Sequence, residues 1–223
     1  MAARAVGGEL AGELIMAVHM GLGARQLPQG LGQLRNRQPK LQVTLHEEPD
    51  LADMERLVRQ GTLDMILVHR FPAGCAIGTH HLGEEAYVAV LPKGAPASLG
   101  RRRPAPGKPG FRGWIRFRRA GLLDDYLARL LVDAGLSPHT VAPASQISTA
   151  VRLVAQGLGV TVVPASAIPE GFEELACPLL PSPTEPVFVG VRPNPGSAQA
   201  AVLDHLHQQN WCGTSLLYQP TTD

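Results

Sequence analysis

The segment from residue 114 to residue 167 constrains the fold more than any other part of this chain. An apolar strand pattern at Trp114 leads into two helical patterns, of which the first ends at Gly135 and the second at Gly157. A buried-strand pattern at residues 160–164 follows directly. Strands and helices in such close succession predict parallel strands covered by helices. Sheets of that kind bind small molecules at the carboxyl ends of their strands.

The front half of the chain predicts a second unit of the same kind. Apolar runs at residues 14–18, 41–45 and 63–68 have the length or the alternation of strands. Leucines at helical spacing predict a helix that ends before Pro39, and an amphipathic pattern predicts another that ends at Gly61. Three strands with two helices between them form an open α/β unit.

The rest of the chain separates these units and adds one more strand and helix. Residues 92–110 contain Pro or Gly at almost every second or third position, which predicts an extended loop. A strand is expected at residues 187–191 and a helix at residues 198–209. The expected fold class is α/β with two lobes, and a ligand is expected in the cleft between them.

Composition excludes several classes of protein. Charged residues make up 17% of the 223 residues and the net charge is +1, so no basic surface for nucleic acid is expected. The longest apolar runs are too short to span a membrane, and acidic residues stand where a signal peptide needs an apolar core. The three cysteines form no close pair, which indicates a reducing compartment and a cytoplasmic protein.

No pattern of residues indicates catalysis or a metal. The chain lacks the Gly-x-Ser-x-Gly and Gly-x-x-x-x-Gly-Lys motifs. Gly157 and Gly159 follow a predicted helix and precede a predicted strand. A dinucleotide-binding loop has the opposite order, because it follows a strand and precedes a helix. Two groups of possible metal ligands lack the paired spacing of zinc sites; they are Cys75 with His80 and His81, and Asp204 with His205 and His207. We therefore expect neither an enzyme nor a cofactor nor a metal.

Six short motifs occur in one order along the chain. They are Gly12-Glu13-Leu14, Leu27-Pro28, Pro39-Lys40-Leu41-Gln42-Val43, Gly61-Thr62-Leu63-Asp64, Val154-Ala155-Gln156-Gly157-Leu158-Gly159-Val160 and Val163-Pro164. Together, from about Gly12 to Gln209, they resemble the effector-binding (substrate-binding) domain of LysR-type transcription regulators. The resemblance implies a two-lobed periplasmic-binding-protein-like (type 2) fold, each lobe an open, mostly parallel sheet flanked by helices, with crossovers near Glu85 and Pro186.

The resemblance also sets expectations for boundaries and function. The expected parts are a linker remnant (1–11), lobe I (12–85 with 186–210), lobe II (86–185) and a flexible tail (211–223). The implied function is to sense a small-molecule effector and thereby change the arrangement of a homodimer or tetramer on DNA. DNA would be contacted only through a winged helix-turn-helix domain, which this sequence does not contain. The alternative is a solute-binding protein of the same fold that serves transport.

Effector contacts are expected where helices begin at the carboxyl ends of strands, because the first turn of a helix presents unpaired N–H groups and a partial positive charge. The candidate effector-binding residues are His19, Met20, Gly21, Leu22, Asp50, His69, Arg118, Gln146, Ser148 and Thr149. Backbone donors and an arginine at such turns favour a small polar or anionic metabolite. In the resembled family a Ser or Thr often stands in the turn after the first strand, where this chain has Gly21.

Several of these residues have an alternative role without a ligand. Ser148 and Thr149 would then cap the helix that follows. His19 and His69 would be hydrogen-bonded or solvated histidines, and Arg118 would face solvent. Asp50 is expected to cap the helix that begins at the next residue, as well as to contact effector.

Overall fold

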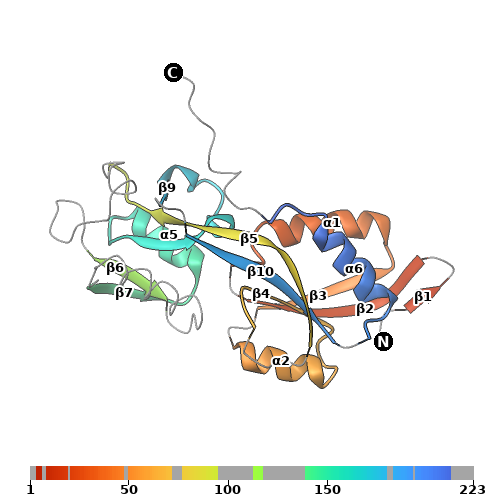
Figure 1. Cartoon of the computed structure of the whole chain (residues 1–223). Coiled ribbons are helices and arrows are strands. Elements are labelled where there is room, and N and C mark those ends of the chain that lie inside the picture. The colour runs from red at the N-terminus through yellow and green to blue at the C-terminus, as the bar shows by residue number, and fades with distance from the viewer. Residues whose placement is uncertain are drawn as a thin grey trace. The chain divides into compact units, whose positions relative to one another are not determined.

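The chain forms two compact units (Figure 1). Unit 1 comprises Met1–Glu84 and Glu185–Cys212, and unit 2 comprises Glu85–Thr184 and Gly213–Asp223. The structure is a computed structural model, and it describes residues 4–6, 9–19, 21–47, 50–71, 77–94, 113–117, 139–179, 183–192 and 194–211. Among the helices of these ranges, none is long and apolar enough to cross a membrane.

Unit 1 is built on a mixed sheet. Its strands are β1 (Arg4–Val6), β2 (Glu9–Val18), β3 (Leu41–Glu47), β4 (Met65–Val68), most of β10 (Thr184–Val191) and the first half of β5 (Gly78–Val90), which neighbours β10. Strand β2 pairs in parallel with both β3 and β4, whereas β1 runs antiparallel to β2 and β10 antiparallel to β4. Parallel pairing needs crossover connections, which α1 (Gln26–Arg37) and α2 (Leu51–Arg59) provide. The carboxyl ends of β2, β3 and β4 therefore lie at one edge of the sheet.

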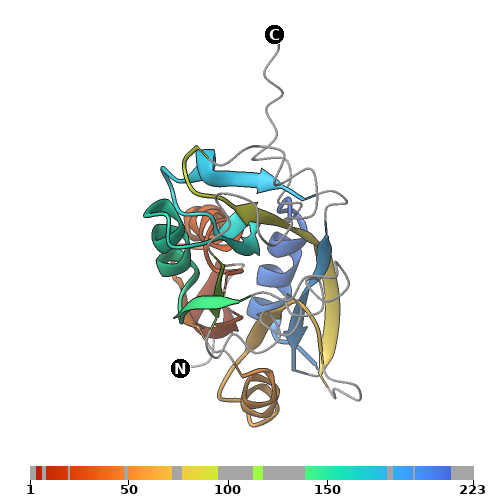
Figure 2. The same ribbon diagram turned by 90° about the vertical axis from the view of Figure 1, so that its left-hand side faces the viewer.

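Helices cover both faces of this sheet. Figures 1 and 2 show α1 and α6 (Ser197–His207) on one face and α2 on the other. Strand β2 has the alternation that two covered faces require. Leu14, Met16 and Val18 belong to the buried cluster that includes α1 and α6, and Ala17 belongs to the cluster that includes α2.

Unit 2 contains two smaller groups of strands. Strand β5 (Gly78–Val90) carries the chain out of unit 1 and pairs antiparallel with β8 (Thr161–Pro164) and β9 (Ala176–Pro178). Strand β6 (Trp114–Phe117) pairs in parallel with β7 (Thr140–Ala144). Helix α5 (Ile147–Ala155) packs on β6, β7 and β8. Gly157 follows that helix with a φ of 77°, a left-handed conformation that glycine adopts without strain.

The helices α1, α2, α5 and α6 and the strands β2, β3, β4, β6, β8 and β10 confirm the elements predicted from periodicity. Four strands were not predicted: β1, β5, β7 and β9. Strand β1 and the start of β2 occupy the stretch predicted to be a linker remnant, so this prediction was wrong and the stretch belongs to the unit 1 sheet. The predicted helix ending at Gly135, most of the predicted loop at 92–110 and most of the predicted tail lie outside the described residues.

Candidate functional site

The candidate site in unit 1 lies at the carboxyl ends of the parallel strands. His19 directly follows β2, His69 directly follows β4, and Asp50 directly precedes α2. The backbone N–H of His19 donates a hydrogen bond to the Leu67 carbonyl oxygen at 2.8 Å. This bond continues the β2–β4 pairing beyond Val18 and brings the two histidines to the same edge.

The side chains of His19 and His69 form a buried pair. Their ring centroids are 6.1 Å apart with an angle of 88° between the planes, an edge-to-face arrangement that aromatic rings favour. His19 is 1% exposed and His69 is 3% exposed, so neither ring is solvated. Neither ring nitrogen of His19 has a hydrogen-bond partner within the described residues. Buried polar atoms are rarely left without a partner, so the His19 ring is a position where a ligand or a water molecule would be held.

Burial also sets the charge of this pair. Desolvation, with a contribution from the positive charge of Arg70, lowers the pKa of His19 from 6.5 to about 4. Desolvation, His19 and Arg70 together lower the pKa of His69 from 6.5 to about 3. Both rings are therefore neutral near neutral pH, and a neutral imidazole has one donor nitrogen and one acceptor nitrogen.

Arg70 adds a cation at the same edge, and it was not among the predicted site residues. Its Nη2 donates a hydrogen bond to Oε1 of Glu185 at 2.7 Å. The Arg70 side chain is 30% exposed and that of Glu185 is 8% exposed. Arg70 donates no other hydrogen bond to the part of the chain that the structure describes, so the remaining N–H donors of its guanidinium can bind a ligand. No local pattern could have revealed this ion pair, because its partners are 115 residues apart.

The turn from His19 into α1 has the features of an anion site. Gly21 has a φ of 92°, and Leu22 is 1% exposed. The first turn of α1 contains no acidic residue that would neutralise its partial positive charge. The first helical residue, Gln26, is 5% exposed, and its Nε2 has no hydrogen-bond partner within the described ranges. Gln26 was not predicted, since a glutamine at the start of a helix usually faces solvent.

Asp50 has a structural role in unit 1. Its Oδ1 accepts hydrogen bonds from the backbone N–H groups of Ala52 at 2.9 Å and Asp53 at 3.2 Å. This confirms the prediction that Asp50 caps α2. Its predicted contact with effector stays a prediction.

The candidate residues of unit 2 lie at the start of α5. Gln146 is the N-cap residue, and its side chain makes no capping hydrogen bond. Gln146 and Thr149 are exposed and Ser148 is half-buried. Ser148 and Thr149 follow the N-cap within the helix, so the alternative that either one is the N-cap is wrong. These polar side chains are accessible to a ligand.

Two predicted site residues, Met20 and Arg118, lie outside the described residues. Four others come together in unit 1 at the edge defined above; they are His19, Gly21, Leu22 and His69. Within the described ranges, no three metal-ligating side chains are grouped closely enough to hold a metal ion. The arrangement in unit 1 is suited to hydrogen bonding and to binding negative charge.

Comparison with known proteins identifies the family of this chain. Residues 7–211 match the family described as the LysR substrate binding domain. The chain is 28% identical over 173 residues to an uncharacterized HTH-type transcriptional regulator, YfeR of Shigella flexneri; the match covers 74% of this chain and 53% of the relative. The chain thus spans about half the length of the curated relatives it matches.

Solved structures show the same fold. A reduced form of OxyR from N. meningitidis superimposes with a TM-score of 0.72 and 22% identity, covering 90% of this chain and 96% of that one. The BenM effector binding domain with its effector benzoate gives a TM-score of 0.69 and 19% identity, covering 89% and 92%. These likenesses confirm the periplasmic-binding-protein-like (type 2) fold class. The curated relatives YfeR and CatR are described as transcriptional regulators. The chain belongs to the LysR substrate binding domain family.

Proposed function

We propose that this chain is the small-molecule-sensing regulatory domain of a LysR-type transcription regulator. In this proposal, all of lobe I (12–85 with 186–210) except Glu85 belongs to unit 1, and all of lobe II (86–185) except Glu185 belongs to unit 2. The observation that carries the proposal is the family match over residues 7–211. The unit 1 edge supports it, because a buried polar side chain without a partner stands where α/β sheets bind their ligands.

The proposed effector is a small anionic metabolite. The BenM domain has benzoate as its effector, and this chain offers hydrogen-bond donors from His19, Gln26 and Arg70. To the contacts expected from the sequence we add Gln26 and Arg70, because both carry side-chain N–H donors that can bind an anion. The proposed set in unit 1 is His19, Met20, Gly21, Leu22, Gln26, Asp50, His69 and Arg70, and in unit 2 it is Arg118, Gln146, Ser148 and Thr149.

Regulation in this proposal follows from differential affinity. An effector that binds one arrangement of a homodimer or tetramer more tightly shifts the population toward that arrangement. DNA is contacted by a winged helix-turn-helix domain of the whole protein, and the protein acts in the cytoplasm. The curated relatives support transcription regulation and give no support to the transport alternative.

A thermal-shift screen of the purified chain against small organic acids, benzoate among them, tests the proposal. A compound that binds the folded chain raises its Tm by mass action. We expect at least one acid to raise the Tm of the wild-type chain and of His46→Asn, a control at an exposed histidine of β3. We expect the shift to be reduced in Arg70→Gln. A folded chain that no acid stabilises, or a shift that Arg70→Gln leaves unchanged, would contradict the proposed site.

A further inference from the structure

The His19 ring is the polar group of unit 1 that most needs an external partner. It is 1% exposed, and both of its ring nitrogens lack a hydrogen-bond partner among the described residues. The ring belongs to the segment that enters α1, a helix of 12 residues without an acidic residue in its first turn. A helix start attracts negative charge, and a buried, unpartnered ring in the segment that leads to it is an independent sign of a missing ligand.

The titratable groups around His19 come from three strands or from the residues that follow them. After β4 stand His69 and Arg70, and β10 contributes Glu185, which is hydrogen-bonded to Arg70. From β3, Glu47 reaches the turn: its Oε1 is 3.9 Å from the position that a Cβ on Gly23 would occupy. The first turn of α1 contributes the neutral Gln26. Arg70 opposes a positive charge on His19, and this opposition weakens when a negative charge is bound at the same edge.

We propose that the effector binds at His19 as an anion together with one proton, which the His19 ring takes up from solvent. This inference rests on the proposed function and deepens it. A neutral imidazole donates from only one nitrogen, whereas the imidazolium donates from both and adds a charge that a carboxylate attracts. The proton comes from the buffer, and no covalent bond to a carbon atom is made or broken. Effector affinity then rises about tenfold for each pH unit of acidification between the pKa values of the ring in the bound and the free state.

Titration calorimetry in two buffers measures the proton directly. The probes are benzoate and each carboxylate that raises the Tm, with the matching amide (benzamide for benzoate) as the uncharged control. In buffers with different ionisation enthalpies at about pH 7, the observed binding enthalpy should differ by the difference between those enthalpies, since one proton is taken up. A merely structural histidine would leave the binding enthalpy independent of the buffer.

Variants assign the proton to a residue. His19→Gln keeps a hydrogen-bonding side chain but cannot titrate, so we expect proton uptake to disappear and the pH dependence of Kd to flatten. His46→Gln, at an exposed histidine of β3, should bind as the wild type does. If His19→Gln does not fold, the His19 ring nitrogens of the wild-type chain are followed by ¹⁵N NMR with and without the carboxylate.

The outcomes separate this inference from the proposed function. Carboxylate binding without proton uptake, or uptake that persists in His19→Gln, overturns the inference and leaves the sensing function intact. Binding of amides but not of carboxylates also overturns the inference and leaves the sensing function intact. If no compound binds the folded chain, both the inference and the proposed function are wrong.

Discussion

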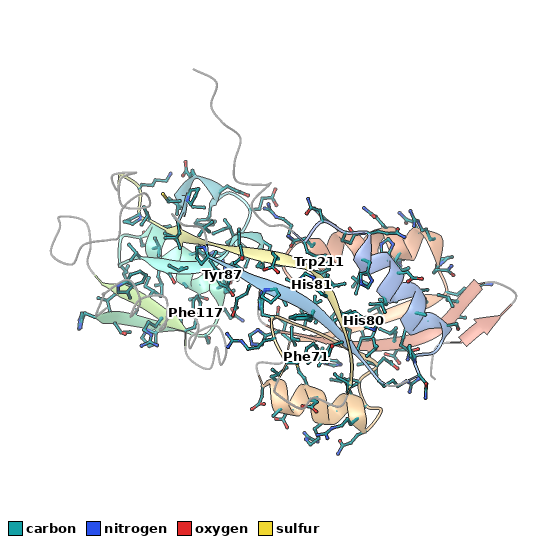
Figure 3. All side chains as sticks on the ribbon, viewed as in Figure 1. Phe71, His80, His81, Tyr87, Phe117 and Trp211 are labelled. Carbon is teal, nitrogen blue, oxygen red and sulfur yellow. The ribbon has the colours of Figure 1, made fainter. Side chains whose placement is uncertain are left out.

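The carboxyl group of Glu85 gives the sharpest prediction for unit 2. Glu85 lies on β5, is fully buried, and comes two residues before the buried Tyr87 labelled in Figure 3. Ser166 follows β8, and its backbone N–H and its hydroxyl donate hydrogen bonds to the two carboxyl oxygens, each at 3.0 Å. Desolvation raises the pKa of Glu85 from 4.5 to about 7, although both Ser166 bonds act in the opposite direction.

The sign of the pH dependence follows from this raised pKa. Between about pH 4.5 and pH 7 the unfolded chain has released the proton of Glu85 while the folded chain still holds it, so stability falls as pH rises through that window. The difference of about 2.5 pKa units corresponds to a loss of about 3 kcal/mol in the free energy of unfolding. Glu85→Gln keeps the shape and the acceptor for the Ser166 N–H but cannot ionise. Relative to the wild type, it should therefore gain about 3 kcal/mol between about pH 4 and about pH 8.

Urea unfolding of both proteins across this pH range is the assay, because the difference between them cancels the contributions of other groups. Glu84→Gln is the matched control, since the adjacent Glu84 side chain is 46% exposed and hydrogen-bonds to His81 at the surface. It should change stability by less than about 0.5 kcal/mol. If the wild type and Glu85→Gln show the same pH dependence, the carboxyl is not desolvated in the folded protein and the reasoning is refuted.

Three further changes test unit 1. Asp50→Ala should lower the free energy of unfolding by about 1 kcal/mol in urea denaturation through loss of the α2 cap, with Asp50→Asn near wild type. Gly190→Ala should destabilise by about 1–3 kcal/mol, because its Cβ would lie 2.7 Å from Ile77 and 2.8 Å from Ile66; an unchanged Tm would mean that these side chains can move aside. The lowered pKa values of His19 and His69 predict that stability falls as pH drops below 6.5, where the unfolded chain binds protons that the folded chain does not. Acid titration of His69→Gln, monitored by circular dichroism, should show a smaller loss than the wild type.

Hydrophobic periodicity predicted most of unit 1 because apolar and polar residues recur there at the spacing of a strand or of a helix. The apolar residues of β2 and the helical spacing of α2 each appear within a short stretch of sequence. Strand β5 was missed because its first seven residues are exposed or half-buried, and polar side chains there give no alternation. Its existence depends on pairing with distant strands, which a local pattern does not contain.

The candidate site was predictable in position but not in chemistry. That His19 and His69 follow parallel strands could be read from the sequence, because strand ends are local features. Their burial could not, since it depends on the packing around the sheet edge. The ion pair between Arg70 and Glu185 depends on the return of the chain along β10. Local sequence patterns therefore locate the edge of the unit 1 sheet, whereas the tertiary structure is needed to show which charged side chains lie there.

The cost of keeping His19 in the fold is itself an argument for function. Burying an imidazole without a partner costs about 1–3 kcal/mol, and an apolar side chain of similar volume would avoid that cost. Sequences depart from local optimisation mainly where function requires it. His19→Leu should therefore raise the free energy of unfolding by about 1 kcal/mol or more at neutral pH while weakening effector binding. Urea denaturation together with calorimetry measures both effects. Loss of the edge-to-face contact with His69 accounts for at most about 1.5 kcal/mol. A larger destabilisation of His19→Leu would mean that the ring nitrogens already have a partner in the protein, and the case for a ligand at this position would then fail.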